Sequence, residues 1–247
     1  MQQMNGLLHG KGAELVGEEL ARWLPRLRHI YTANHKLSTH FPGTAPEKNI
    51  AFRKEMHEKW RGASAKGDTA EKIALANHYV IDWGGVKSNK PETLERYSGM
   101  RSRDLISLGM QGISSWSKII SIHSPRKYPI YDARVALSLN AIQAVILGEI
   151  RLWFHIPSTQ IKTIPIEAAK LQTLCISASS IPRKDAYKAY LAYLDHMGLS
   201  SRRQRTEMLL FAASPTLVDL LAAVPAASFN SATLQALLPT LRQTLKV

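Results

Sequence analysis

The chain has 247 residues, and its 32 lysines and arginines against 19 aspartates and glutamates give a formal net charge of +13. Hydrophobic residues make up 45% of the chain, enough for a substantial core, which excludes wholesale disorder. The single cysteine, Cys175, excludes an internal disulfide and any zinc or iron–sulfur site held by cysteines.

In chain order, the first half predicts helices separated by turns. Apolar spacing and turn signals predict helices over 13–31 with a break at Pro25, over 49–61, over 69–81 with Asp68 as its cap, and a short one opened by Glu92. Residues 32–48 predict a surface loop, GASAKGD (62–68) a linker, and DWGGVKSNKPETL (82–94) a turn.

The second half continues this pattern. Helices are predicted from Ser114 or Ser115 to Ser124, and over 133–147, 183–197, 201–212, 215–223 and 230–245. Residues 151–166 are expected to be irregular, and the helix over 133–147 is apolar nearly all round, which predicts a central place in the core. No strand-rich block is present, so we expect an all-α fold in a single unit over 1–247. Two lobes flanking a cleft, 1–100 with 200–247 and 101–199, are compatible with it.

The positive charge favours a polyanionic partner, with nucleic acid first and an anionic membrane surface second. The N-terminal stretch lacks the charged-then-apolar order of a signal peptide, and no window of about 18 apolar residues is present. We therefore expect a monomeric protein of a reducing cytoplasm, bacterial or phage-type and nucleoid-associated, with no membrane partner.

Asp132, in the stretch KYPIYDARVAL (127–137), is the first candidate for chemistry, because a carboxylate is costly to bury among apolar residues. It can cap the helix over 133–147, or form an ion pair with Arg134 or Lys127. It can also be catalytic, since a carboxylate at a buried helix N-terminus is oriented and kept ionised by the helix dipole.

Lys118, in SSWSKIIS (114–121), has apolar neighbours at helical spacing. One interpretation is a surface lysine whose ammonium reaches water along its apolar stem. The other is a desolvated amine whose pKa falls, so that a neutral, nucleophilic fraction appears. The sequence alone leaves both open.

Two clusters in the second half offer contacts to nucleic acid. One is an aromatic cluster of Tyr187, Tyr190 and Tyr193, and the other is a basic cluster of Arg202, Arg203 and Arg205. The tyrosines share a helical face and either pack in the core or stack on bases. The arginines stand at a helix start, where they oppose the dipole, so phosphate contact would account for them.

Other motifs are weaker. His123 is interpreted as a helix C-terminal residue, which the dipole favours. The WGG of 83–85 is typical of a tight turn. No histidine spacing matches a zinc motif, and no phosphate-binding glycine loop is present, so we expect neither a metal nor another cofactor.

The order of these features resembles the helix-hairpin-helix DNA glycosylases, particularly the 8-oxoguanine DNA glycosylase branch. LGMQGISSWSKII (108–120) stands for the hairpin and the helix with a lysine near its start, and Asp132 stands before an apolar helix. The likeness covers roughly 105–145. It implies a compact, multi-helix glycosylase-like fold with a helix-hairpin-helix-like DNA-binding element.

By that resemblance Lys118 is the Schiff-base nucleophile and Asp132 the essential carboxylate of a DNA glycosylase with AP-lyase activity on double-stranded DNA. No cofactor is implied. Together with the basic clusters, it gives these expected DNA contacts: Gly109, Gly112, Ser114, Ser115, Ser117, Lys127, Arg134, Arg202, Arg203 and Arg205. The expected stacking partners of a flipped base are Trp83, Trp116 and Tyr131.

Two other classes of function stay open. A non-catalytic, basic helical protein would bind DNA or RNA with strong salt dependence but release no base. In a partner-binding domain, the weakly charged tail after Met208 would dock on another protein. For the glycosylase itself, the excised base and the choice between base-excision repair and phage defence are open.

Overall fold

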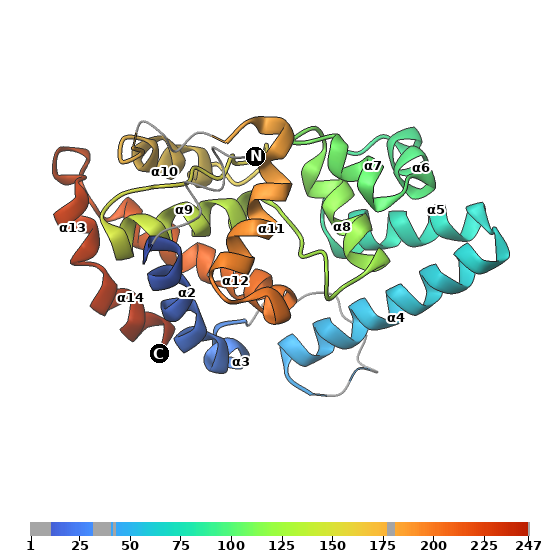
Figure 1. Cartoon of the computed structure of the whole chain (residues 1–247), viewed down its shortest axis with the longest axis horizontal. Helices are drawn as coiled ribbons and strands as arrows, with labels where there is room; N and C mark the ends of the chain where they lie inside the picture. The colour runs from blue at the N-terminus through green and yellow to red at the C-terminus, as the bar shows by residue number, and fades with distance from the viewer. Residues whose placement is uncertain (1–10, 32–40, 42, 177–180, 247) are drawn as a thin grey trace.

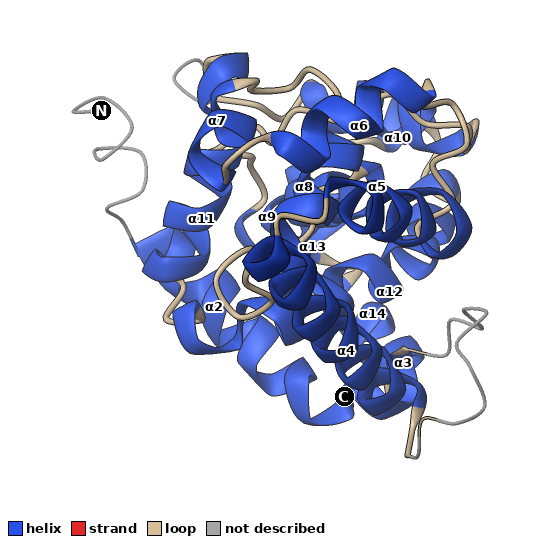
Figure 2. Cartoon of the chain, turned by 90° about the vertical axis from the view of Figure 1, so that its right-hand side faces the viewer, coloured by secondary structure: helices blue, strands red, loops and turns tan. Residues whose placement is uncertain are grey.

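The computed structural model describes residues 11–31, 41, 43–176 and 181–246. Within these residues the chain is compact and all-helical, as predicted, and Figure 2 accordingly contains helices and loops alone. A single bridge between Ile150 and Cys175 is the nearest approach to sheet structure in the described part. None of the described helices is long and apolar enough to cross a membrane.

The helices form two groups that lie side by side in Figure 1. The first, here the α4–α8 group, contains α4 (Ala45–Lys66), α5 (Thr69–Asn77), the π-helical segment η2 (His78–Trp83), α6 (Pro91–Gly99), α7 (Ser102–Ser107) and α8 (Ile113–His123). Helix α8 packs against α4, α7 and η2 in this group, and its Trp116 also contacts Tyr187 of the second group.

The second, here the α9–α14 group, also includes the N-terminal helices. It contains α2 (Lys11–Trp23), η1 (Leu24–Arg26), α3 (Leu27–Ile30), α9 (Ala133–Leu147), α10 (Thr163–Gln172), η3 (Arg183–Asp185), α11 (Ala186–His196), η4 (Ser200–Arg202), α12 (Arg203–Ala222), η5 (Ala226–Ser228), α13 (Ser231–Gln235) and α14 (Leu238–Leu245). The contacts thus divide the chain differently from the lobes expected from sequence, because 45–123 packs together and 11–31 joins the second half.

Helix α9 is the centre of the second group, which confirms its predicted place. It contacts α12, α13, α10 and α2, and its residues from 135 to 144 are buried on every side. Gly148 ends the helix at φ +75°, a left-handed conformation that favours glycine. An apolar helix enclosed in this way gives its N-terminal residue, Asp132, a fixed position.

Several boundaries differ from the sequence predictions. Residues 62–66 of the expected linker are helical, since α4 continues until Gly67 turns left-handed at φ +67°. The two helices expected over 201–212 and 215–223 are one, α12, in which Pro215 lies inside the helix. The helix expected over 230–245 is two, with a proline in the first turn of α14.

Other local predictions hold or need a smaller correction. The expected break at Pro25 is present as η1, and Asp68 caps α5 by accepting a hydrogen bond from the Glu71 N–H at 2.9 Å. Residues 151–166 are irregular only up to α10, whose first turn holds Pro165, a position where proline is tolerated. Of the loop expected over 32–48, residues 45–48 are instead the start of α4, and residues 32–40 and 42 lie outside the described residues.

The tail after Met208 belongs to the core. Leu234 and Leu241 are fully buried, and the Arg242 guanidinium donates to Glu19 of α2 at 2.7 Å through Nε and Nη2. The low charge of this segment therefore reflects burial within the α9–α14 group. A free tail that docks on another protein is not what the structure contains.

Candidate active site

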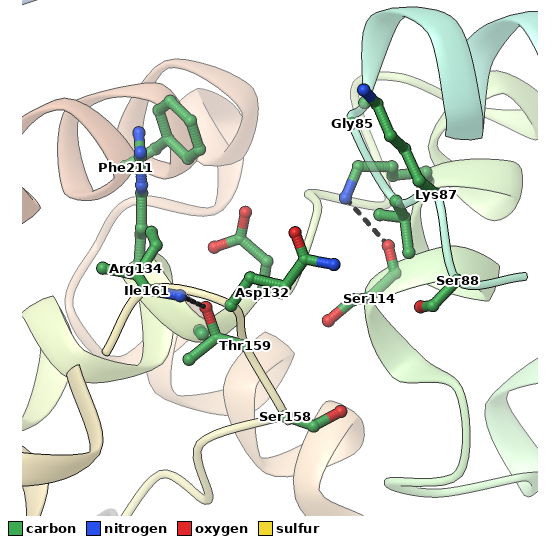
Figure 3. Close-up of a pocket in the computed structure, with 15 residues that line it drawn as sticks. Gly85, Lys87, Ser88, Ser114, Asp132, Arg134, Ser158, Thr159, Ile161 and Phe211 are labelled. Atoms are coloured by element: carbon green, nitrogen blue, oxygen red, sulfur yellow. Dashed lines mark hydrogen bonds between the residues drawn. The ribbon is translucent and has the colours of Figure 1, made fainter. Parts of the chain in front are cut away.

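A cavity of ≈ 540 Å³ opens where the two helix groups meet (Figure 3). The α4–α8 group contributes residues 84–88, Ser114 and Lys118, and the α9–α14 group contributes 132–134, 158–161 and Phe211. In Figure 3, Asp132 lies between a wall made by Lys87 and Ser114 and a wall made by Arg134 and Phe211. The two residues first singled out in the sequence therefore come from different groups and share one cavity.

Lys118 lies in the first half of α8, and its side chain is 4% exposed. The Nζ donates a hydrogen bond to the Ser114 carbonyl oxygen, one helical turn earlier, at 2.8 Å. Of the two interpretations from sequence, the surface lysine is wrong and the desolvated amine fits. Lys118 therefore lines the cavity while its side chain is almost completely shielded from bulk water.

Gly84 provides the surface on which Lys118 lies. A Cβ atom added to Gly84 would be 2.6 Å from Lys118 Cε, 2.7 Å from its Cδ and 2.8 Å from the Val80 carbonyl oxygen. The backbone of Gly84 is helical at φ −80° and ψ −10°, so its requirement is for space rather than for an unusual conformation. The WGG turn, weak evidence in the sequence, thus seats the lysine.

Asp132 is the N-cap of α9, as predicted. Its backbone is extended, and Oδ1 accepts a hydrogen bond from the Val135 N–H at 3.0 Å. The suggested ion pairs are not its partners in the described residues, where Arg134 lies over the Phe211 ring and Lys127 over the Tyr128 ring. The cap fixes the carboxylate through one oxygen while the residue lines the cavity.

A second, smaller cavity of ≈ 40 Å³ adjoins the first along Gly84, Lys118, Asp132 and Phe211, which line both. Its remaining lining residues are Tyr31, Arg53, Trp83, Ile130 and Glu207. Arg53 of α4 and Glu207 of α12 form a buried ion pair, with Nη2 of Arg53 3.0 Å from Oε1 of Glu207 and a second bond from Nη1 to Oε2. This pair links the two helix groups directly beneath the candidate site.

The environment of Lys118 destabilises its charged form. Burial is the main cause, and it lowers the pKa of the Lys118 amine below the ordinary value. The negative charges of Asp132 and Glu207 act in the opposite direction, and the positive charge of Arg53 adds to the lowering. The net direction is downward, so more of the amine is uncharged and nucleophilic at neutral pH than in an exposed lysine.

The charge on the larger cavity suits an anionic ligand. Besides Lys118, its lining carries the cationic side chains of Lys87 and Arg134 against the single carboxylate of Asp132. Hydroxyl and amide groups of Ser88, Ser114, Ser158, Thr159 and Gln160 complete the polar part of the wall. Cations with neutral hydrogen-bonding groups are the usual contacts of a sugar–phosphate backbone.

The chain forms a glycine-bearing turn at residues 108–112, between α7 and α8. Gly109 and Gly112 have φ values of +58° and +66°, which only glycine adopts readily. Gly109 is buried, and a Cβ there would lie 2.6 Å from Lys184 Cα. Gly112 is exposed, although a Cβ there would lie 2.3 Å from the Tyr97 hydroxyl oxygen. Gly112 and the adjacent Gln111 are the part of the turn that faces outward.

The other expected DNA contacts divide into buried and accessible residues. Ser115 and Ser117 are buried, donating to Asn89 Oδ1 at 2.9 Å and the Tyr131 carbonyl at 3.2 Å, so the expectation that they contact DNA is wrong. Arg203 is engaged by Asp195 at 2.7 Å and by the Lys127 carbonyl at 3.0 Å. The accessible ones are Ser114 and Arg134 in the cavity wall and Lys127, Arg202 and Arg205 on the surface.

Of the three aromatic candidates for stacking on a base, only Trp83 lines a cavity. Trp116 and Tyr131 are fully buried, donate to the backbone carbonyls of Gln111 and His155, and line neither cavity, which corrects that expectation. Trp83 stacks on Tyr79 with ring centroids 4.5 Å apart.

The remaining predictions for aromatic residues concern the core. Tyr187, Tyr190 and Tyr193 are buried, so core packing is correct and base stacking is excluded. His123 ends α8 as expected, but burial lowers its pKa to about 4, so it is neutral there. Its Nδ1 lies 2.9 Å from Ser102 Oγ.

Sequence reasoning missed several lining residues. Gly84 lies in the WGG turn and Lys87 lies just after it. Nothing in the sequence marks this turn as part of a site, because its contact with Lys118 is visible only in the structure. Arg53 and Glu207 are 154 positions apart in the chain, and each looks like an ordinary charged residue of a helix. Residues 158–161 belong to a segment expected to be irregular, and no pattern there indicates a site.

Comparison with protein-family models, with curated proteins and with solved structures found no match. Among the described residues, no group of three or more histidine, cysteine, aspartate or glutamate side chains is placed to hold a metal ion. The case for a function therefore rests on the geometry and charge of the two cavities.

Proposed function

We propose that this protein is a DNA glycosylase with AP-lyase activity, in which Lys118 is the nucleophile and Asp132 the essential carboxylate. The observation that carries the proposal is the meeting of a buried amine and a capped carboxylate, from two helix groups, at one cavity with a cationic wall. The proposal includes a glycosylase-like fold, with α7, the turn at 108–112 and α8 as the helix-hairpin-helix-like element, and a monomer in the cytoplasm.

The proposed role of Asp132 is electrostatic. Breaking the N-glycosidic bond leaves positive charge on C1′ and O4′ of the sugar, which a nearby carboxylate stabilises, as in other glycoside cleavages. The cap holds Asp132 through the Val135 N–H, so the carboxylate is in place before the charge develops. Its position at the start of the buried helix α9 limits its movement.

The proposed role of Lys118 is covalent. The neutral Nζ donates its lone pair to C1′ as the C1′–N bond breaks, and the departing base takes up a proton. The amine then loses a proton, the C1′–O4′ bond opens with protonation of O4′, and a protonated imine links C1′ to the lysine. Loss of a C2′ proton expels the 3′ phosphate by elimination, which nicks the strand.

Duplex DNA is the proposed partner, and the target nucleotide must leave the stack to reach these groups. Lys87, Arg134 and Ser114, which line the larger cavity, would contact its phosphates. The base would enter the smaller cavity, between Phe211 and Trp83. At ≈ 40 Å³ this cavity is smaller than a nucleobase, so entry requires a side chain such as Phe211, which is half-buried, to move.

Borohydride trapping tests this proposal directly. The protein is incubated with duplexes carrying an abasic site, an oxidised purine or a modified pyrimidine, and a reduced imine is detected as a covalent protein–DNA adduct. Wild type should form the adduct and Lys118→Gln should not, with Lys54→Gln, at an exposed lysine of α4 that lines neither cavity, as the matched control. Salt-sensitive binding without an adduct or base release on any duplex would favour the non-catalytic nucleic-acid-binding protein instead.

A further inference from the structure

The buried ion pair below the candidate site is not needed for the chemistry proposed above. Arg53 and Glu207 are 2% and 3% exposed by side chain, on α4 and α12, and both line the smaller cavity together with Lys118 and Asp132. A buried ion pair is seldom a net gain in stability over a well-packed apolar pair. Its presence at this location therefore calls for a role in the site.

The contacts of Glu207 show how its charge is used. Both carboxylate oxygens accept from the Arg53 guanidinium, and Oε2 also lies 3.4 Å from the Ile130 N–H. The carboxylate is thus occupied from two directions, by α4 and by the segment that leads into Asp132. Lys118, although it lines the same cavity, donates to the Ser114 carbonyl instead.

The pair also holds together the two parts of the site. Arg53 belongs to the α4–α8 group with Lys118, and Glu207 to the α9–α14 group with Asp132. A second contact joins the groups nearby, where Asn49 of α4 donates to the Tyr31 hydroxyl at 2.8 Å. A break in the ion pair would therefore affect both the charge beside Lys118 and the alignment of the two groups.

We propose that Arg53 and Glu207 are a positioning pair for Lys118. Arg53 neutralises the Glu207 carboxylate, which would otherwise compete with Ser114 and Asp132 for the lysine amine. The amine then stays at the larger cavity and is not drawn into an ion pair in the smaller one. The positioning pair rests on the proposed function only in giving the Lys118 amine a catalytic role. The effect of Arg53 and Glu207 on the amine can be measured without DNA.

The charged and titratable groups around Lys118 define the expected direction. They are Asp132 at the start of α9, Glu207 on α12 and Arg53 on α4, with Tyr31 and Tyr79 near the ion pair. Arg53→Met leaves the carboxylate of Glu207 beside the amine and should raise the pH at which Lys118 loses its proton. Glu207→Gln leaves the guanidinium and should lower that pH. Both shifts are expected to be on the order of one pH unit.

The experiment follows the titration of Lys118 in the folded protein. Lysines are dimethylated with ¹³C-formaldehyde and borohydride, and the Lys118 signal is identified by its absence from Lys118→Gln. Its midpoint is measured for wild type, Arg53→Met, Glu207→Gln and the conservative Arg53→Lys, which keeps the charge and should stay near wild type. Opposite shifts in the first two variants support the positioning pair, and unchanged midpoints overturn it.

Two further readouts keep the outcome clear. If Arg53→Met does not fold, Glu207→Gln, which keeps the size of the side chain, decides alone, and an unchanged midpoint overturns the proposal. The same variants are then tested for borohydride trapping on abasic DNA. If the midpoints move as expected but wild type gives no adduct, the positioning pair stands and the glycosylase proposal fails.

Discussion

Gly84→Ala is the sharpest test of the way in which Lys118 is held. The new Cβ would lie 2.6 and 2.7 Å from two methylenes of the lysine, whereas carbon atoms rest at about 3.5–4.0 Å. The lysine stem must therefore retreat by about 1 Å, because the other neighbour, the Val80 carbonyl at 2.8 Å, belongs to the backbone. The expected cost is about 1–3 kcal/mol in the free energy of unfolding, typical of an overpacked core.

The larger effect is expected on chemistry. Misplacing a reacting group by about 1 Å costs roughly 100-fold in rate, so adduct formation by Gly84→Ala should fall by about that factor. The rate of borohydride trapping on abasic duplex DNA measures it, at a temperature well below the unfolding midpoint of the variant. The Lys118 Nζ should also lose its bond to the Ser114 carbonyl in a structure of the variant.

Gly62→Ala is the matched control. Gly62 lies within α4, where a Cβ would meet nothing within 4 Å, so alanine should stabilise the protein by about 0.5–1 kcal/mol and leave trapping unchanged. If Gly84→Ala were folded and trapped DNA at the wild-type rate, Lys118 would not be held against Gly84. Gly84 would then have no part in positioning the amine.

Four more predictions follow from the same contacts. Lys118→Met should raise the free energy of unfolding at pH 7, because it removes the cost of burying a charged amine. The pKa of the buried amine lies below its ordinary value of 10.5, so this gain should vanish as the pH approaches 10.5 and the wild-type amine becomes neutral. Urea titrations at several pH values measure the free energy of unfolding of both proteins. Asp132→Asn should keep the helix cap and lose base release, and full base release by this variant would contradict the catalytic role of Asp132. Asp132→Ala should lose the cap as well, which should cost about 1 kcal/mol of stability in thermal denaturation. Leu241→Ala should cost about 2–5 kcal/mol, as a fully buried core residue, and a change below 0.5 kcal/mol by the same method would show that the tail is not part of the core. Lys87→Ala and Arg134→Ala should each lower the salt slope of DNA binding by about one, measured by fluorescence anisotropy, and an unchanged slope would remove that residue from the interface.

Local patterns were enough to predict the helices that carry the two candidate residues. The bounds of α8 and α9 and the cap at Asp132 follow from apolar spacing and a capping residue, which act within one or two turns. The same local rules failed at Pro215, where the surrounding core holds α12 continuous through the proline. They also failed at residues 62–66, where glycine and serine continue α4 although both are common in linkers.

Local sequence patterns could not predict which residues line the site. Ser117 was expected to contact DNA because it belongs to the stretch that resembles the hairpin region, but its hydroxyl is hydrogen-bonded to the backbone of Tyr131. Conversely, Arg53 and Glu207 look like surface charges in the sequence, whereas in the structure both are buried in an ion pair between α4 and α12. Both errors arise because the direction of a side chain depends on which segments pack beside it.

The arrangement of buried charges bears on the choice between catalysis and simple binding of nucleic acid. A protein that only binds a polyanion needs cations at its surface, where each costs little to hydrate. Here a lysine is buried instead, together with an ion pair and next to a carboxylate, in the wall of a cavity that accepts solvent. Lys118 contributes less to long-range attraction in that position than it would outside, and burial lowers the pKa of its amine. An amine placed at that cost is better suited to forming a bond with a substrate than to attracting one, which is why we place the glycosylase proposal ahead of the binding protein.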